Sequence, residues 1–300
     1  MDGDIIWLFV QQGVASGLVS GAVYALLALA IVIVYRTTDV ANFAQGEIYM
    51  AASYIAFFLI VVFAAPSYVA IPVTILIVCG VSAAFQRLVL TRVASARGVS
   101  VNLVIATLGL SYFLKGIVRS SGFGDAPRSF PSVVPDGTVM IGDASLSYLD
   151  VVIFAASLVV MALFFWVFTY TKLGRAMRAV GMNRRAAALV GISLSRVQMQ
   201  VWAFSGGISA IAALLIAPKL LLTVEMGHIA TLAFAAAIVG GFTSLPGAVV
   251  GGFIIGIAEN MVGLFASSRA IIVTPFVVIM LVLTLMPQGL FGGAIRVRKV

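Results

Sequence analysis

The chain has 300 residues, of which 62% are hydrophobic and only 9% are charged, and its mean hydropathy is +1.18. Ordinary soluble domains carry roughly 25% charged residues, so this composition excludes a water-soluble protein. The formal net charge of +8 is compatible with nucleic-acid binding, but basic residues of a bilayer protein more often mark its cytoplasmic side.

Apolar runs long enough to cross a bilayer recur along almost the whole sequence. A hydrocarbon core about 30 Å thick needs about 20 apolar residues per helix. The runs are continuous rather than alternating, which favours helices over a β-barrel. We therefore predict an all-α integral membrane protein with one transmembrane domain over residues 1–300, a polytopic bundle of about eight to nine spans in which discontinuous or re-entrant helices can occur. The expected spans are 10–35, 47–64, 69–90, 101–119, 149–170, 197–217, 228–241, 247–266 and 270–286.

The basic residues are distributed unevenly between the two sides of this bundle. If the amino terminus is outside, alternation of the spans leaves few basic residues on the outer face. The cytoplasmic ones are then Arg36, Arg87, Arg92, Arg97, Lys172, Arg175, Arg178, Arg184, Arg185, Arg196, Arg296, Arg298 and Lys299. The excess of basic residues thus indicates the orientation of the chain in the membrane. We therefore expect membrane lipid, and no nucleic acid, as a partner.

Faces of small residues occur early and late in the chain. Gly13, Gly17 and Gly21 are four residues apart in the first span, and Gly252 and Gly256 repeat the spacing in a later one. Such faces let helix backbones approach closely in lipid. We expect tight helix packing, with a glycine-lined translocation path as the alternative.

Two polar segments interrupt the apolar runs, one in each half of the chain. Interrupted segments of this kind indicate the central pathway of a transporter. The residues that we expect to line such a pathway are Asn42, Gln45, Thr243 and Ser244. Two tight turns at the cytoplasmic surface fit the charge distribution equally well.

Glu259 and Asn260 lie well inside a later apolar run, where an ionisable residue is costly. They are further pathway candidates. Contact with a partner subunit, or capping of a neighbouring helix end, are the alternatives for Glu259.

Two loops are long. The outer loop, residues 120–148, contains Pro127, Pro131 and Pro135, which favours irregular structure, and it either receives a partner or is only a surface loop. The inner loop, residues 171–196, is basic. In it, Asn183 can cap a short helix that runs through the alanines and ends at Gly191. Composition alone also allows a helical anchor with no further role.

The sequence lacks the residues of several enzyme classes. A phosphate-binding loop of the type G-x-x-x-x-G-K-[ST] would need a Gly-Lys pair, and the chain has none. One histidine, His228, and one cysteine cannot assemble a usual zinc site, and a lone histidine at an expected membrane boundary argues against a Ser-His-acid hydrolase. We expect no enzyme activity, no metal and no bound cofactor, so any ATP must be hydrolysed by another chain.

Three segments together resemble one family, the LivH-type permeases of branched-chain amino acid ABC importers. Residues 34–47 resemble its element Y-R-x-x-x-x-x-N-F-A-x-G-E. Residues 173–193 resemble the cytoplasmic coupling loop, G-x-A-x-R-A-x-x-x-N-x-x-A-A-x-L-x-G-I, and residues 240–252 resemble G-G-x-x-S-x-x-G-A-x-x-G-G. The segments follow the family's order and cover nearly the whole chain.

The resemblance implies an alternating-access permease of the bacterial inner membrane. Its partners would be a similar second permease subunit, two cytoplasmic ATPase subunits that use ATP, and an extracytoplasmic substrate-binding protein. The residues implied in coupling to the ATPase are Gly181, Asn183, Arg184, Arg185, Ala186, Ala187, Leu189 and Gly191. The arginines would meet acidic groups of the ATPase, while Ala186, Ala187 and Leu189 would pack against it.

The resemblance leaves the substrate open among leucine-like amino acids, urea, amides and aromatic acids, and a homodimer or a heterodimer remains open as well. Two other functions fit the composition. One is an ion-coupled secondary transporter that uses Glu259, and the other is a passive channel for small solutes.

Overall fold

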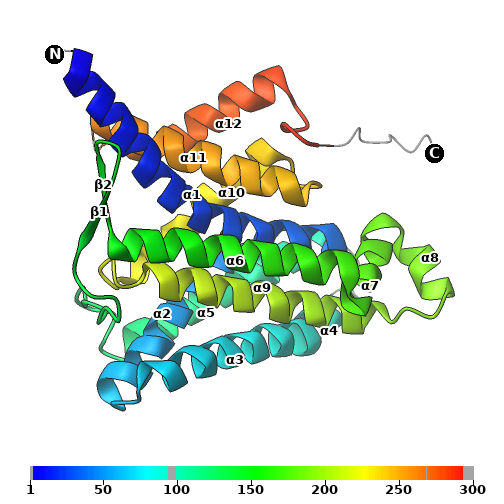
Figure 1. The fold of residues 1–300 in the computed structure, drawn as a ribbon. Coiled ribbons are helices and arrows are strands. Elements are labelled where there is room, and N and C mark those ends of the chain that lie inside the picture. Colours follow the sequence, from blue (N-terminus) through cyan, green and yellow to red (C-terminus); the bar gives the residue numbers. More distant parts are fainter. Residues whose placement is uncertain (1–2, 94–98, 268, 293–300) are drawn as a thin grey trace. The chain divides into compact units, whose positions relative to one another are not determined.

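The computed structural model describes residues 3–93, 99–267 and 269–292 (Figure 1). The chain divides into two compact units. Unit 1 comprises Met1–Val32, Val134–Ala155 and Ala230–Val300, and unit 2 comprises Ile33–Val133 and Ala156–Ile229. One transmembrane domain over the whole chain stays a prediction. Four basic residues of the topology argument, Arg97, Arg296, Arg298 and Lys299, lie outside the described residues.

Helices dominate the described residues, and seven of them are long and apolar enough to cross a membrane. The predicted all-α, polytopic fold is therefore confirmed. The helices are α1 Gly3–Thr38, α2 Gln45–Phe57, α3 Ser67–Phe85, α4 Thr91–Val93, α5 Val99–Ser120, α6 Tyr148–Tyr170, α7 Lys172–Met182, α8 Arg184–Leu189, α9 Leu194–Ile216, α10 Ile229–Gly240, α11 Leu245–Phe265 and α12 Thr274–Leu285. Short π and 3₁₀ turns are η1 Phe58–Val62, η2 Gln86–Leu90, η3 Val224–His228 and η4 Ala270–Ile272.

Two of the nine expected spans are shorter than a full crossing. They contain α10 and α12, each of 12 residues. At 1.5 Å per residue, such a helix rises about 18 Å, less than the roughly 30 Å of the hydrocarbon core. Together with the turns η3 and η4 that precede them, they form the apolar segments Val224–Gly240 and Ala270–Leu285.

A β-hairpin in unit 1 was not predicted for the outer loop. Its strands, β1 Thr138–Ile141 and β2 Ala144–Ser147, pair antiparallel with Thr138 opposite Ser147. The Gln12 side chain of α1 fastens it, because its amide donates to the Ser145 carbonyl at 3.1 Å and accepts from the Ser145 N–H at 2.9 Å. The Pro-rich part of the loop before the hairpin is irregular, as expected.

Within unit 1, the glycine faces of α1 and α11 bring the two backbones together. A Cβ on Gly17 would lie 2.7 Å from Ile257 Cα, and a Cβ on Gly21 would lie 2.9 Å from Phe253 Cα. No side chain fits in so narrow a gap, so only glycine permits the contact. The predicted tight packing is confirmed for these residues.

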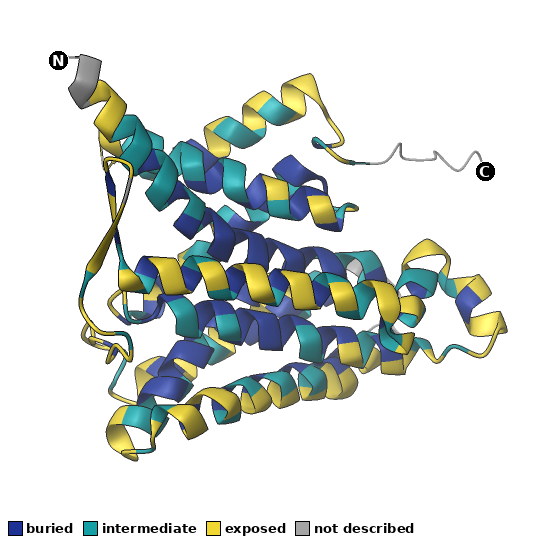
Figure 2. Cartoon of the chain, in the orientation of Figure 1, coloured by how far each residue is buried: buried dark blue, intermediate teal, exposed yellow. Residues whose placement is uncertain are grey.

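In unit 2, α9 packs against α3 and α2, and α2 also packs against α5 and η3. Buried residues follow most of α9, whereas α3 carries a long exposed apolar face (Figure 2). An apolar outer face suits lipid, which supplies no hydrogen bonds. The core of unit 2 therefore lies between α2, α3 and α9, and the candidate site is built there.

Candidate functional site

The connection between α1 and α2 is irregular and buried. α1 ends at Thr38, Asp39 has a φ of +55°, and the next helix begins only at Gln45. Asn42 is 1% exposed and Gln45 is 0% exposed. Buried backbone outside a helix needs partners within the protein, and the Asn42 Oδ1 accepts one bond, from the Ala44 N–H at 3.0 Å.

Hydrogen bonds to α9 show how far the connection between α1 and α2 extends along that helix. Near the start of α9, the Gln198 amide donates to the Thr37 carbonyl at 3.5 Å. Near the middle of α9, Ser205 donates to Gln45 Oε1 at 3.3 Å, and Gln45 Nε2 donates to the Ser209 hydroxyl. The serines lie seven to eleven residues beyond Gln198, or about 10 to 16 Å along the helix. The connection therefore packs along α9 as far as the middle of that helix, and whether it is re-entrant or a surface turn stays a prediction.

Four side chains form a buried polar cluster, here named the amide hub: Asn42, Gln45, Ser205 and Ser209. The Asn42 amide donates to Gln45 Oε1 at 2.8 Å, so this oxygen accepts from both Asn42 and Ser205. Polar groups are costly to bury without partners, and each hub side chain has one. The hub is uncharged and offers amide and hydroxyl groups. It joins the two predicted residues Asn42 and Gln45 to α9.

A row of charged side chains begins next to the hub, at Glu47. Lys115 Nζ lies 3.6 Å from Glu47 Oε1 and 3.5 Å from Glu225 Oε2, and Arg119 lies 3.4 Å from the same Glu225 carboxylate. The exposed fraction of the side chain rises along the row, from 11% for Glu47 and 26% for Lys115 to 55% for Glu225 and 64% for Arg119. This charge row therefore leads from the surface of unit 2 towards the hub.

An apolar cavity of about 320 Å³ lies between α2, α3 and α5 of unit 2. Its walls include Ala51 from α2, Phe58 from the adjoining turn η1, Val78 from α3, and Leu114 and Val118 from α5. Hydroxyl groups are its main polar feature, and no charged side chain lines it. Such a space suits an aliphatic group of a small solute.

The inner loop folds into two helices, α7 and α8, and the predicted ends of the second are confirmed. Asn183 Oδ1 accepts from the Ala186 N–H at 3.1 Å, which caps α8 at its start. Gly191 has a φ of +83°, the conformation that glycine adopts most readily after a helix. The helix before it, α7, is capped by Thr171, which accepts from the Gly174 N–H at 3.1 Å.

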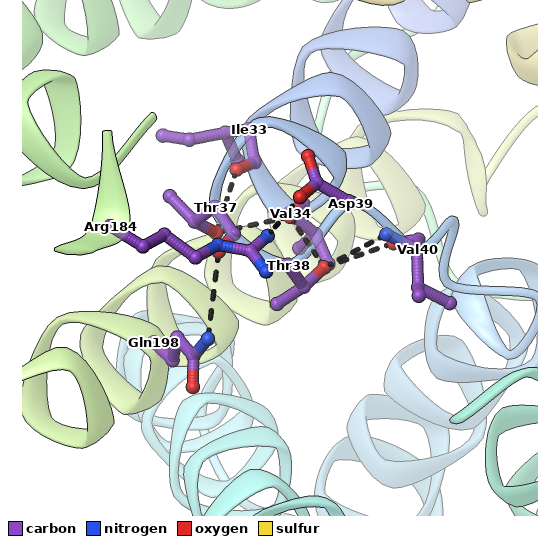
Figure 3. A network of polar contacts seen from close by, with 8 residues as sticks. All are labelled: Ile33, Val34, Thr37, Thr38, Asp39, Val40, Arg184 and Gln198. Carbon is purple, nitrogen blue, oxygen red and sulfur yellow. Dashed lines mark hydrogen bonds and ion pairs between the residues drawn. The ribbon is translucent and has the colours of Figure 1, made fainter. Parts of the chain in front are cut away.

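The contacts of α8 show how its predicted coupling residues lie within this chain. Arg184 Nη2 lies 2.9 Å from Asp39 Oδ2 at the end of α1, so its acidic partner is in this chain (Figure 3). Ala187 is only 3% exposed within this chain, and packing of its methyl group against an ATPase stays a prediction. Arg185 and Ala186 are exposed, and Leu189 is 88% exposed. These three residues and the exposed Ala188 form the outward surface of α8.

The end of α7 also lies against α1. A Cβ on Gly181 would be 3.2 Å from the Arg36 carbonyl oxygen, so a larger residue would crowd the backbone of α1. The guanidinium groups of Arg36 and Arg178 lie 5.6 and 5.4 Å from the centre of the Phe168 ring. Gly181 thus serves the attachment of the α7–α8 hairpin to α1.

Comparison with known proteins agrees with this geometry. The sequence profile of the family described as branched-chain amino acid transport system/permease component matches residues 13–286. The chain belongs to this family. The permease protein BraD of Pseudomonas aeruginosa is 30% identical, over 96% of this chain and 97% of its own. The permease protein LivH of Escherichia coli strain K12 is 31% identical, over 95% of this chain and 96% of its own. Both are named as high-affinity branched-chain amino acid transport system permease proteins.

A more distant relative and a solved structure extend the comparison. A probable branched-chain amino acid transport permease LivH of Methanocaldococcus jannaschii is 30% identical, over 81% of this chain and 78% of its own. The structure of PsaBC from Streptococcus pneumoniae in complex with Fab has a TM-score of 0.50 at 13% identity, over 93% of this chain and 92% of that chain. The latter likeness supports the fold alone. Family membership and seven apolar helices make the chain a multi-pass membrane protein.

The other predicted pathway residues of this permease lie in unit 1. Ser244 caps α11 by accepting from the Gly247 N–H at 3.1 Å, and Thr243 is exposed in the turn before it. The Asn260 amide donates to the Gly256 carbonyl at 2.9 Å within α11. Ser244 and Asn260 thus have local structural roles, and the pathway role of all three stays a prediction.

Glu259 is partly buried on α11. Tyr24 hydrogen-bonds to its side chain, while its Oε2 is buried and has no hydrogen-bond partner in the described part of the chain. A role for Glu259 in the pathway stays a prediction.

Sequence reasoning missed several residues of the site. Glu47 is the last residue of the N-F-A-x-G-E element, and this position was the signal for it. Lys115 lies near the end of an apolar run, where a charge is a functional signal. No sequence pattern distinguishes Ser205 and Ser209 from the many other serines of the chain. Asp39 was missed because only the fold brings it to Arg184.

Proposed function

We propose that this chain is the membrane-spanning permease subunit of an ATP-driven ABC importer in the bacterial inner membrane. Its substrate is a branched-chain amino acid or a related small solute. Its partners are a similar second permease subunit, two cytoplasmic ATPase subunits and an extracytoplasmic substrate-binding protein. ATP is used by the ATPase subunits, and this chain carries no cofactor. Family membership and the names of the relatives support the proposal.

The observation that carries the proposal is the exposed apolar surface at the end of α8. Leu189 is 88% exposed, Val190 76%, and Met182 at the end of α7 84%. A helix capped at its start and terminated by glycine holds these side chains in fixed positions. The surrounding arginines support a cytoplasmic position of the hairpin by the positive-inside rule. Such a surface suits a hydrophobic groove of a cytoplasmic protein.

The substitution Leu189→Glu tests this docking surface. Burying a leucine side chain contributes about 1.5–3 kcal/mol, so its loss should weaken ATPase binding by at least about tenfold. We expect a membrane-inserted subunit that fails to co-purify with the ATPase and that loses substrate-stimulated ATP hydrolysis in liposomes. Ser195→Glu is the matched control, because Ser195 is exposed in the first turn of α9. Normal ATPase binding and uptake by Leu189→Glu would contradict the proposal.

The same assay separates the alternative functions. An ion-coupled transporter, or a passive channel, would keep its uptake when the α8 surface is altered, because neither depends on an ATPase. The ion-coupled alternative relies on Glu259, whose Oε2 is buried without a hydrogen-bond partner in the described residues. Neither alternative is favoured by the relatives, which are permease proteins of transport systems.

A further inference from the structure

A second cavity of unit 2 lies where the connection between α1 and α2 meets η2, α5, α8 and α9, and its volume is about 80 Å³. One water molecule needs roughly 10–15 Å³ of such space, so the cavity has room for a molecule of a few non-hydrogen atoms. This polar cavity differs from the apolar one in its walls. The side chains that give it this character are Thr38, Gln86, Thr107, Arg184, Gln198 and Trp202.

Two buried polar groups of the polar cavity lack a partner. Trp202 on α9 and Gln86 on η2 are each 2% exposed. In the described part of the chain, Trp202 Nε1 and Gln86 Oε1 have no hydrogen-bond partner. A polar group is costly to bury without one. Because both residues line the polar cavity, a molecule held there can supply the missing partners.

The amide groups of Gln86 and Gln198 are also incompletely used. Gln86 Nε2 donates to Gln198 Oε1 at 3.4 Å, and Gln198 Nε2 donates to the Thr37 carbonyl at 3.5 Å (Figure 3). Both distances exceed the usual 2.7–3.2 Å of an N–H···O bond. Each amide nitrogen carries a second hydrogen. The two glutamines can therefore donate to a third group in the cavity.

Arg184 brings a positive charge to the polar cavity. Its Nη2 lies 2.9 Å from Asp39 Oδ2, but the Asp39 side chain is 76% exposed and is not among the described residues that line the cavity (Figure 3). A guanidinium has five N–H donors, and a bidentate carboxylate uses two of them. The remaining donors of Arg184 add to those of Trp202 and the glutamines. Donors and positive charge thus dominate the cavity.

We propose that the polar cavity is a binding site for a small oxyanion, either a short carboxylate or inorganic phosphate. The oxygens of the anion accept from the Arg184 guanidinium and from Trp202 Nε1, and the glutamine amides complete the site. The planar guanidinium with its N–H donors matches the oxygens of both kinds of anion. The side chains of the amide hub are not among the described residues that line this cavity. The inference is therefore independent of the transported solute.

Asp39 and the anion share one guanidinium, so the two compete for Arg184. The carboxylate of Asp39 also repels a bound anion. The pair with Asp39 is mostly exposed and therefore weak, which leaves Arg184 free to bind a second group. Removal of the Asp39 charge should consequently favour the anion.

The fluorescence of Trp202 reports on an anion in the cavity. The full-length chain is placed in nanodiscs of phosphatidylcholine, which has no net charge, and Trp7 and Trp166, the other two of its three tryptophans, are replaced by phenylalanine. Iodide, an anion that quenches tryptophan on contact, is titrated at constant ionic strength, with neutral acrylamide as the reference. We expect iodide to quench Trp202 saturably, although this residue is 2% exposed, and acrylamide to quench it little.

Competition in the same sample identifies the kind of oxyanion. Acetate and inorganic phosphate are each added at constant ionic strength against a fixed concentration of iodide. We expect both to restore the fluorescence, because both present oxygens to the same donors. The stronger competitor shows whether the site prefers a carboxylate or a phosphate.

Substitutions then assign the charge. Arg184→Gln should weaken iodide binding at least about tenfold, because it removes the charge of the cavity. Arg185→Gln is the matched control and should change it by less than about twofold, since Arg185 is exposed on the same helix and is not among the described residues that line the cavity. Asp39→Asn should tighten binding about two- to fivefold, because a competing carboxylate is lost. This gain also guards against a variant that merely unfolds.

Several results would overturn the anion site. Equal quenching of Trp202 by iodide and acrylamide, or quenching by iodide that does not saturate, would mean that the cavity holds only water. Failure of both acetate and phosphate to displace iodide would exclude an oxyanion. Equal affinities in Arg184→Gln and Arg185→Gln would show that the anion binds elsewhere.

Discussion

Replacing Gln45 by leucine should remove the centre of the amide hub. Three side-chain hydrogen bonds meet at Gln45, from Asn42 at 2.8 Å, from Ser205 at 3.3 Å, and to Ser209. Leucine fills a similar volume but makes none of them. In helical membrane proteins such bonds average about 0.6 kcal/mol each, which gives about 2 kcal/mol for the three. The soluble-protein cost of about 1–3 kcal/mol per unsatisfied group would give more, but unfolded chains in a membrane also find partners.

The assay is the free energy of unfolding of the purified subunit, measured in mixed micelles for single and double variants. A cycle of Gln45→Leu with Ser209→Ala should give a coupling energy of about 0.6 kcal/mol. Ser53→Ala is the matched control, because the Ser53 hydroxyl on α2 is fully buried and without a hydrogen-bond partner in the described residues. It should not couple to Gln45. Strict additivity in both cycles would refute the hub as an energetic unit.

Two further substitutions test the packing and the cytoplasmic contact. Gly17→Val should prevent the chain from folding, because a Cβ at this position would lie 2.7 Å from Ile257 Cα. Gly80→Val is the control and should fold normally, because no atom lies within 4 Å of a Cβ there. The yield of folded protein is measured by size-exclusion chromatography, and equal yields for the two variants would contradict the packing argument. Asp39→Asn should lower the free energy of unfolding by less than about 1 kcal/mol, because Asp39 is 76% exposed in its pair with Arg184. The same substitution should increase the rate of amide hydrogen exchange in α8. An unchanged exchange rate would show that the pair does not hold α8.

The features that the sequence predicts correctly are those set by neighbours along the chain. Asn183 and Gly191 bound α8 because capping and a left-handed residue are local properties of the backbone. The glycine spacing in α1 and α11 likewise predicts close helix contact, since residues four apart share a face. The positions of the spans follow from runs of apolar residues, because the thickness of the bilayer fixes the length that such a run must have.

The features that the sequence misses depend on which distant segments meet. Ser205 and Ser209 join the hub only because α9 packs on α2, about 160 residues away along the chain. Ala187 looks available for a partner until the fold buries it. The hairpin of β1 and β2 is fastened by Gln12, which no local pattern could indicate. Ser244 reads equally well as a pathway residue or as a helix cap, and only the coordinates show the cap.

The segment between α1 and α2 joins two contacts of different strength. At its start, Asp39, which is 76% exposed, pairs with Arg184 of α8, and a pair with one such exposed partner is worth less than about 1 kcal/mol. At its inner end, Gln45 is fixed by three buried hydrogen bonds worth about 2 kcal/mol together. We therefore expect substitutions at Gln45 to cost more stability than substitutions at Asp39. Because Asp39 already has a positive φ, and the residues after it are not helical, the backbone there can change direction without breaking a helix.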